Sequence, residues 1–240
     1  MTRWTSQVVT SLLAVLAVGA AVSGFTAAPA AAKGAAYHPA IDPANFQHQV
    51  DHPYLPLVPG TSYRYLERQG GETRENEVTV LPDTKVVMGV ACVVVHDVVR
   101  EGGELREDTY DWYAQDKQGN VWYFGEDTKE MKHGKVDTEG SWEAGVGNNS
   151  PGIIMPAAAK PGKPFRQEYG PGHAEDMGQI VAVGEATLVP YGAFKDCVRT
   201  KEWSLLEPGA EKKWYARGVG VVRTESTSKE VSVLVSMTKP

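Results

Sequence analysis

Carboxylates and aromatic rings are concentrated between residues 107 and 127 of the chain. Asp111 and Glu126 flank the aromatic residues Tyr113, Trp122 and Phe124. Two carboxylates about 5 Å apart can divide the roles of general acid and nucleophile. Aromatic rings can stack on an organic ligand. The segment is therefore the strongest candidate for a site of binding or catalysis.

The same segment has the pattern of a β-hairpin. Residues 116–120 (Asp-Lys-Gln-Gly-Asn) have turn chemistry and lie between two aromatic, β-prone runs. A loop of two or four residues puts the acids and the rings on one face of the hairpin. The opposed pairs are then Asp111 and Glu126, Tyr113 and Phe124, and Gln115 and Trp122. Like charges that oppose each other on a sheet destabilise it unless solvent, a cation or a shared proton relieves them.

Two non-catalytic interpretations of this face compete. In the first, it is the solvated side of a sheet whose other face forms the core. In the second, Tyr113, Trp122 and Phe124 form a stacking platform, and Asp111 and Glu126 orient a ligand. The first predicts that the acids are individually dispensable, and the second that they face a ligand.

A catalytic interpretation competes with both. Asp111 and Glu126 would act as an acid and base pair in a secreted hydrolase or lyase. Glu143 lies in the segment that follows the hairpin, and His173 lies in a Gly-rich turn, so either could complete such a site. These residues form the alternative catalytic set.

Familiar signatures of enzymes and metal sites are absent from the sequence. It contains no Gly-x-Ser-x-Gly elbow, phosphate-binding loop or His-Glu-x-x-His motif. His38, His48 and His52 are irregularly spaced, and no cysteine accompanies them. We therefore expect neither a cofactor nor a metal site.

The elements that position these residues belong to an exported chain. Basic Arg3 precedes an apolar run at 12–22 and a small-residue stretch at 27–32, which is the order of a cleavable signal peptide. Small side chains at Ala30 and Ala32 predict cleavage after residue 32, and no lipobox cysteine is present. The mature protein is then secreted or extracytoplasmic, with no membrane span after cleavage.

The net charge of the chain limits the classes of partner that it can bind. The chain has 24 basic and 30 acidic residues, and the predicted signal contains a single basic residue, so the mature part carries a net charge of about −7. Acids and bases are interspersed without a basic block. Nucleic acid is excluded as a partner, because its binding needs clustered Lys and Arg. A small molecule or a neutral polymer fits better.

The chain has two cysteines, Cys92 and Cys197. An even number in an exported chain predicts one disulfide, with two buried free thiols as the alternative.

Short β-prone runs, punctuated by Gly, Pro and Asp, predict a mainly β protein with little helix. The expected strands are residues 62–67, 77–81, 91–99, 109–115, 121–125, 165–169, 179–183, 197–203, 212–216, 220–224 and 231–237.

An internal repeat organises these strands. Matching Pro-Gly, Gly-to-Cys and Trp-Tyr-Ala patterns recur in the same order at an offset of roughly 102 to 105 residues. They define two five-strand copies, 59–126 and 161–226, joined by 127–160 and preceded by an arm at 33–58. Each copy alone would leave an apolar sheet face uncovered, so we expect one domain, 59–240, formed as an antiparallel barrel, half-barrel or sandwich.

Two resemblances agree with this description. Segment 107–127, with 140–145 and 151–156, resembles a group of exported bacterial β-rich proteins of unassigned function. Segments 189–194 and 214–222 are similar to those of lipoprotein-carrier-like half-barrel proteins. The resemblances imply a fold and a location, and they transfer no catalytic residue.

The sequence therefore predicts an exported binding protein for a small or neutral ligand, which it binds with the aromatic and acidic face of the hairpin. The alternatives are a carboxylate-dependent secreted enzyme and a structural envelope protein without a ligand.

Overall fold

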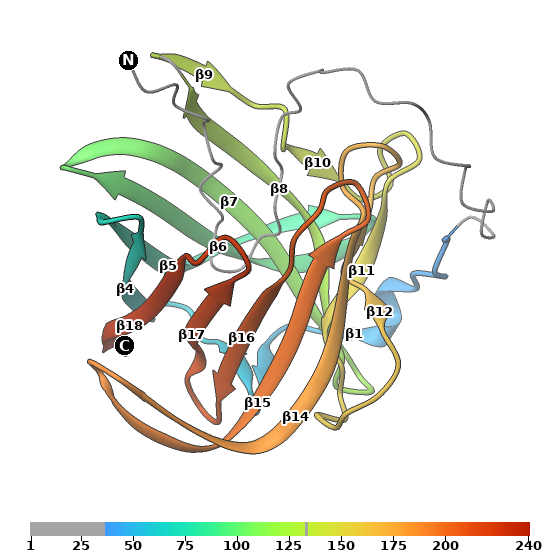
Figure 1. Cartoon of the computed structure of the whole chain (residues 1–240). Helices are drawn as coiled ribbons and strands as arrows, with labels where there is room; N and C mark the ends of the chain where they lie inside the picture. Colours follow the sequence, from blue (N-terminus) through green and yellow to red (C-terminus); the bar gives the residue numbers. More distant parts are fainter. Residues whose placement is uncertain (1–36, 133) are drawn as a thin grey trace.

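The computed structural model describes residues 37–132 and 134–240, and the predicted signal peptide lies outside these residues. The described chain forms a strongly curved antiparallel sheet that nearly closes into a barrel (Figure 1). Helix in this part is limited to one turn of 3-10 helix, η1 (Pro43–Asn45). The prediction of a mainly β protein with little helix is confirmed.

Ten long strands build most of the wall. They are β4 (Ser62–Gln69), β5 (Glu72–Val87), β6 (Val90–Glu101), β7 (Glu104–Asp116), β8 (Val121–Lys132), β14 (Asp176–Val189), β15 (Gly192–Ser204), β16 (Glu211–Ala216), β17 (Gly220–Ser226) and β18 (Val231–Thr238). The short strands are β1 (Phe46–Gln47), β2 (Val50–His52), β3 (Leu55–Leu57), β9 (Lys135–Asp137), β10 (Trp142–Glu143), β11 (Ser150–Met155), β12 (Phe165–Arg166) and β13 (Glu168–Tyr169). Every predicted strand range coincides with part of this set.

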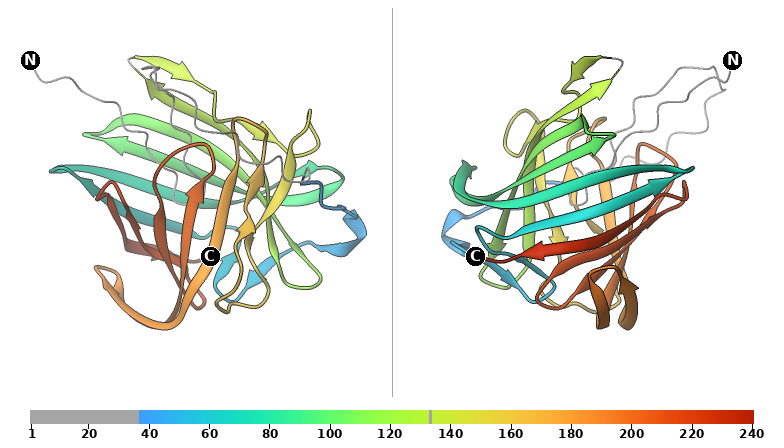
Figure 2. Two further views of the ribbon diagram at one scale, coloured as in Figure 1. Left: turned by 45° about the vertical axis from the view of Figure 1, so that its right-hand side comes forward. Right: turned by 90° about the vertical axis from the view of Figure 1, so that its left-hand side faces the viewer.

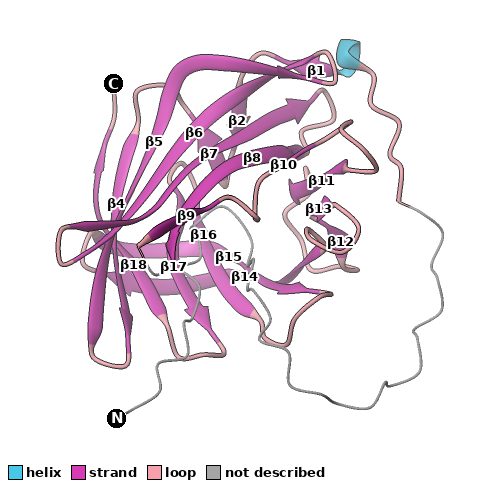
Figure 3. Ribbon diagram, turned by 90° about the horizontal axis from the view of Figure 1, so that it is seen from above, coloured by secondary structure: helices cyan, strands magenta, loops and turns pink. Residues whose placement is uncertain are grey.

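Most neighbours in the sheet are consecutive hairpins, and two further junctions bring strands distant in sequence together (Figure 3). At the first, β18 pairs with β4, with Leu234 opposite Tyr65. At the second, residues 165–169 hydrogen-bond on both sides, because β12 pairs with β14 and β13 pairs with β11. The five-residue segment therefore brings the two ends of the sheet together (Figure 2).

One end of the barrel is covered by the hairpin β2–β3 of the N-terminal arm. Asp51 N donates to Gln115 Oε1 at 2.9 Å, and Gly218 N donates to Pro53 O at 2.8 Å. Val50, Tyr54, Leu55 and Leu57 belong to the buried apolar cluster. Burial of apolar surface holds the arm against this end.

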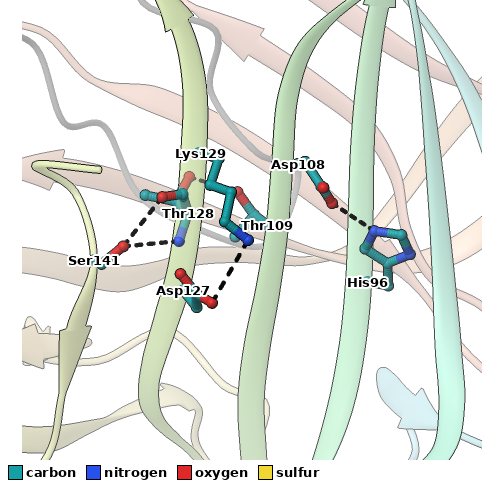
Figure 4. A network of polar contacts seen from close by, with 7 residues as sticks. All are labelled: His96, Asp108, Thr109, Asp127, Thr128, Lys129 and Ser141. Carbon is teal, nitrogen blue, oxygen red and sulfur yellow. Dashed lines mark hydrogen bonds and ion pairs between the residues drawn. The ribbon is translucent and has the colours of Figure 1, made fainter. Parts of the chain in front are cut away.

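The free edge of β8 is protected by short partners. β9 pairs with β8 at Glu130–Lys132 and β10 pairs with it at Gly125–Glu126. Between them, Ser141 Oγ accepts a hydrogen bond from Thr128 N at 2.9 Å and donates one to Thr128 O at 3.1 Å (Figure 4). The Ser141 side chain thus satisfies the backbone N–H and C=O of Thr128, at a position of β8 where neither β9 nor β10 pairs with it.

Two hairpins share an irregularity. The register of β7 and β8 shifts between Trp112 and Tyr113, and that of β16 and β17 shifts between Trp214 and Tyr215. The two predicted copies place these residues at equivalent positions. The duplication itself stays a prediction.

The predicted disulfide is wrong: Cys92 and Cys197 are both buried free thiols. They lie on β6 and β15, and five strands separate these two in the sheet. Alternation along the strands also points both thiols away from the interior, because their neighbours Val93 and Val198 face inward. A disulfide needs Cα atoms within about 7 Å, which opposite walls of a barrel do not provide.

Candidate functional site

Eight of the buried carboxyl side chains that line the barrel interior form the set that we call the acid ring. They come from seven strands, and none is more than 7% exposed. The members are Glu67 of β4, Glu107 and Asp111 of β7, Glu126 of β8, Glu168 of β13, Asp176 of β14, Glu202 of β15 and Glu211 of β16.

Strand alternation puts these acids inside. On β7, Glu107, Thr109 and Asp111 are buried, whereas Asp108 and Tyr110 between them are partly exposed. On the outer side, Asp108 contacts His96, with 2.7 Å between Oδ1 and Nε2 (Figure 4). The period of two that normally directs apolar side chains inward therefore directs acids inward here.

Asp111 and Glu126 oppose each other across β7 and β8, as the sequence predicted. Tyr123 Oη donates a hydrogen bond to Asp111 Oδ1 at 2.7 Å. The rings of Tyr113 and Tyr123 stack, with centroids 4.9 Å apart. At 0% and 7% exposure, the two acids do not lie on a solvated sheet face.

Toward the turn, the predicted register is wrong. Tyr113 opposes Tyr123 and Trp112 opposes Gly125, so Phe124 is the extra residue of a β-bulge. Gly125 has φ 130°, and a Cβ there would lie 2.3 Å from Trp142 O. Glycine at this position therefore permits the bulge and the close approach of β10.

The bulge divides the predicted aromatic platform. Trp122 and Phe124 pack against Phe46 of the N-terminal arm, with centroid distances of 6.3 and 5.5 Å. Trp122 Nε1 donates to Asp116 Oδ2 at 2.8 Å. Of the three predicted rings, Tyr113 alone joins Asp111 and Glu126 in the interior.

The two other predicted catalytic residues lie elsewhere. Glu143 Oε2 is 2.8 Å from Lys85 Nζ, and Lys85 lies 3.5 Å from the centroid of the Trp112 ring. His173 is exposed in the turn that precedes Ala174. Neither residue meets the pair of carboxyls in the interior.

A buried ion pair belongs to the ring. Lys213 Nζ lies 3.0 Å from Glu202 Oε2 and 3.7 Å from Glu211 Oε2, and the Lys213 and Glu202 side chains are 2% exposed. Burial raises the pKa of Glu202, but the Lys213 charge and a hydrogen bond from Thr200 outweigh it and leave this pKa below its usual value. Glu202 and Lys213 are therefore both charged.

Most other ring members favour the protonated form. Burial, followed by repulsion from neighbouring acids, raises the pKa of Asp111 and Glu126 well above their usual values. Asp97 of β6 contributes to this repulsion at Asp111. Burial likewise raises the pKa of Asp176 and of Glu211 to about 7. The ring can thus exchange protons near neutral pH.

Several polar atoms that face the ring lack a hydrogen-bond partner. Tyr113 Oη and both amide atoms of Asn76 are in this group, and both side chains are 0% exposed. Asp111 Oδ2 and Glu168 Oε2 lack partners as well. Buried polar atoms are almost always satisfied in native proteins, so these atoms indicate a place where a polar ligand can bind.

The sequence contained a signal for the second half of the ring. Glu211, Lys213 and Tyr215 alternate along β16 in the same way as Thr109, Asp111 and Tyr113 along β7. Sequence reasoning missed Glu202, Glu211 and Lys213, because the inward face of a strand is normally apolar.

Between residues 37 and 240, residue 133 excepted, no group of three or more His, Cys, Asp or Glu is arranged to hold a metal ion. In the same part of the chain, no helix is long and apolar enough to cross a membrane.

The fold and the interior side chains define an antiparallel, barrel-like β-sheet with an acidic interior. No family model and no curated protein matches the chain. A solved structure from Bacteroides fragilis, provisionally described as an exported protein with a YmcC-like fold, is similar with 16% identity and a TM-score of 0.48, covering 78% of this chain and 99% of that chain. Another, from Parabacteroides distasonis, is provisionally described as a lipoprotein and has 13% identity and a TM-score of 0.37, covering 77% of this chain and 98% of that chain. Similarity at this level assigns no function.

Proposed function

We propose that the protein is an extracytoplasmic binding protein that holds a small polar ligand at the acid ring. The unpartnered polar atoms of Tyr113, Asn76 and Asp111 carry this proposal. A buried hydroxyl or amide without a hydrogen bond destabilises the fold by about 1 to 3 kcal/mol, and a ligand that supplies the missing partner removes that loss.

Location and architecture support the same function. The predicted signal peptide directs the protein out of the cytosol. The arm covers one end of the barrel, so a ligand would reach the interior from the other end. β-Barrels larger than the smallest ones can enclose a ligand in their interior.

The site differs from the one expected from the hairpin alone. Its aromatic part is the stacked pair Tyr113 and Tyr123, and Trp122 and Phe124 instead anchor the arm. Asp111 and Glu126 keep the orienting role that the sequence suggested.

The test is a screen of the purified protein against glycans, amines, amino acids and aromatic metabolites, read out as a rise in melting temperature. Asp111→Asn and Tyr113→Phe should abolish the rise for the ligand found. Asp108→Asn, on the outer face of the same strand, is the matched control and should retain it. The proposal fails if no compound shifts the wild-type protein, or if the interior variants respond as the control does.

A carboxylate-dependent hydrolase or lyase is the second candidate. The direct opposition of Asp111 and Glu126, with a Tyr123 hydroxyl on Asp111, favours it. In that case Asp111→Asn should lower turnover of the bound compound about a hundredfold or more while its affinity changes little. If Asp111→Asn loses affinity for the compound and the wild-type protein does not turn it over, the enzyme candidate fails and the binding function stands.

A further inference from the structure

We propose that the ligand of the acid ring is a small organic cation with two or more amino or guanidino groups. The inference rests on the proposed function, because it specifies the chemistry of what the interior binds.

The first argument is the charge inside the barrel. Eight ring carboxyls share the interior with Lys213, the one fully buried lysine or arginine in the described part of the chain. Two further cations border the ring: Arg74 lies 3.7 Å from Glu101 and its charge also acts on Glu67, and Arg166 lies 3.7 Å from Glu175 and its charge also acts on Glu168. The interior therefore has many more acidic than basic groups, and a bound cation would favour the ionised form of the carboxyls that it contacts.

The second argument is a set of buried oxygens that can still accept a hydrogen bond. Buried oxygens without hydrogen-bond partners include Glu107 Oε2, Asp111 Oδ2 and Glu168 Oε2. Ammonium and guanidinium groups are donors only, with three and five N–H groups respectively. Carboxylates accept such donors in strong, charge-assisted hydrogen bonds. The unpartnered hydroxyl of Tyr113 adds a neutral acceptor on the same face.

The third argument separates an organic cation from a metal ion. A metal needs several ligand atoms within about 2.0 to 2.6 Å of one point. The ring carboxyls are instead distributed over seven strands around the barrel, and no described cluster has a geometry for a metal. A molecule with spaced cationic groups can reach carboxyls on opposite walls.

Tyrosine rings next to the acids suit the same ligand. Tyr113 and Tyr215 follow Asp111 and Lys213 by two residues on the inward faces of β7 and β16. Tyr215 Oη donates to Glu202 Oε1 at 3.1 Å. All these rings are fully buried. Aromatic faces attract organic cations and pack against their methylene chains.

Access is from the end opposite the arm. Asp176 and Glu211 are the first residues of their strands, and Glu67 is two residues from the end of β4. A small pocket at this end is lined by Glu67, Arg74 and Glu230, among other residues. The acid ring is therefore close to the end that the arm leaves uncovered.

The experiment measures binding of spermidine and putrescine to the purified protein by calorimetry, with butanediol as the uncharged match of putrescine and magnesium chloride as the inorganic cation. Spermidine should bind most tightly, and butanediol and magnesium should not bind. Glu126→Gln and Glu168→Gln should each weaken spermidine binding about tenfold or more, because each removes a carboxyl that can ionise beside the bound cation. Asp127→Asn, the exposed neighbour of Glu126, is the control and should leave binding unchanged.

Each of the other outcomes contradicts either the cationic ligand alone or the binding function as well. If uncharged or anionic compounds from the general screen bind, and Asp111→Asn abolishes their binding while amines do not bind, the cationic ligand is wrong and the binding function stands. If magnesium binds in place of spermidine, the organic cation is wrong. If no compound of either set binds, both proposals fall. If a Gln variant fails to fold, binding is measured with Tyr113→Phe instead. This variant keeps every charge and should still lose affinity if the ligand binds at the ring.

Discussion

At the scale of single residues, the interior combines charged and neutral acids. Lys213 keeps Glu202 ionised, whereas Asp111 and Glu126 are pushed toward their protonated forms. A protonated carboxyl can donate a hydrogen bond as well as accept one, which lets acids lie close together without repulsion. At Asp111 the charge of Lys213 acts to lower the pKa, but burial and repulsion from Asp97 outweigh it.

Removing that ammonium should be strongly destabilising. Lys213→Met is expected to lower the free energy of unfolding by about 3 to 5 kcal/mol, because Glu202 would remain as a buried charge without its partner. Urea denaturation at neutral pH measures the change.

Lys212→Met is the matched control, since Lys212 is exposed on the same strand, and it should change stability by less than about 0.5 kcal/mol. The double variant Lys213→Met with Glu202→Gln should recover part of the loss. Equal stability of the Lys213 and Lys212 variants would contradict the role of the ion pair.

At the scale of elements, the hairpin β7–β8 depends on its bulge. One extra residue, Phe124, turns one aromatic ring toward the arm and leaves Tyr113 and Tyr123 in the interior. Gly125 makes this possible, because its φ of 130° and its contact with Trp142 O exclude a side chain.

Gly125→Ala should therefore lower the free energy of unfolding by about 2 to 4 kcal/mol, through backbone strain and a forced shift of β10. Thermal or urea denaturation reports it. Gly192→Ala is the control: a Cβ at Gly192 would contact nothing within 4 Å, so its stability should be nearly unchanged. A Gly125 variant as stable as this control would show that the bulge tolerates a side chain.

Much of the fold was predictable from the sequence, and less of the site. The eleven strands follow from β-prone runs between turn residues, and Asp111 opposite Glu126 follows from the hairpin. The bulge at Phe124 was missed, although Gly125 beside it is the residue type that marks a bulge inside a strand. The disulfide was expected from residue count, which says nothing about which walls carry Cys92 and Cys197. The ring escaped notice because its members come from strands distant in sequence.

At the scale of the whole molecule, the acid ring sets the dependence of stability on pH. The folded-state pKa values of Asp176 and Glu211 are raised by burial to about 7, whereas both groups titrate near about 4 in an unfolded chain. A raised folded-state pKa gives stability that is complete below the unfolded pKa and is lost as pH rises through the folded one. Glu202 acts in the opposite sense: its contribution to stability is present above the unfolded pKa, near about 4, and is lost as pH falls through its lowered folded-state pKa.

The protein without a ligand should therefore be more stable near about pH 5 than near about pH 8, by on the order of a few kcal/mol. Urea denaturation at intervals across this range measures the slope. Asp176→Asn removes one of the groups that titrate near 7 and should flatten the decline. A free energy of unfolding that rises from pH 5 to pH 8 would contradict this prediction. It would mean that the ring carboxyls are ionised in the folded protein and that positive groups of the same chain stabilise their charges.

The junction between β18 and β4 has a consequence for the timing of folding. Leu234 pairs with Tyr65, so nearly the whole described chain lies between two strands that are neighbours in the wall. The entropy of closing such a long loop must be overcome before the pairing contributes stability, which slows folding. The wall cannot become continuous until residues 231–238 are available. If the predicted signal peptide exports the chain, slow closure of the barrel keeps the chain unfolded for passage across the membrane.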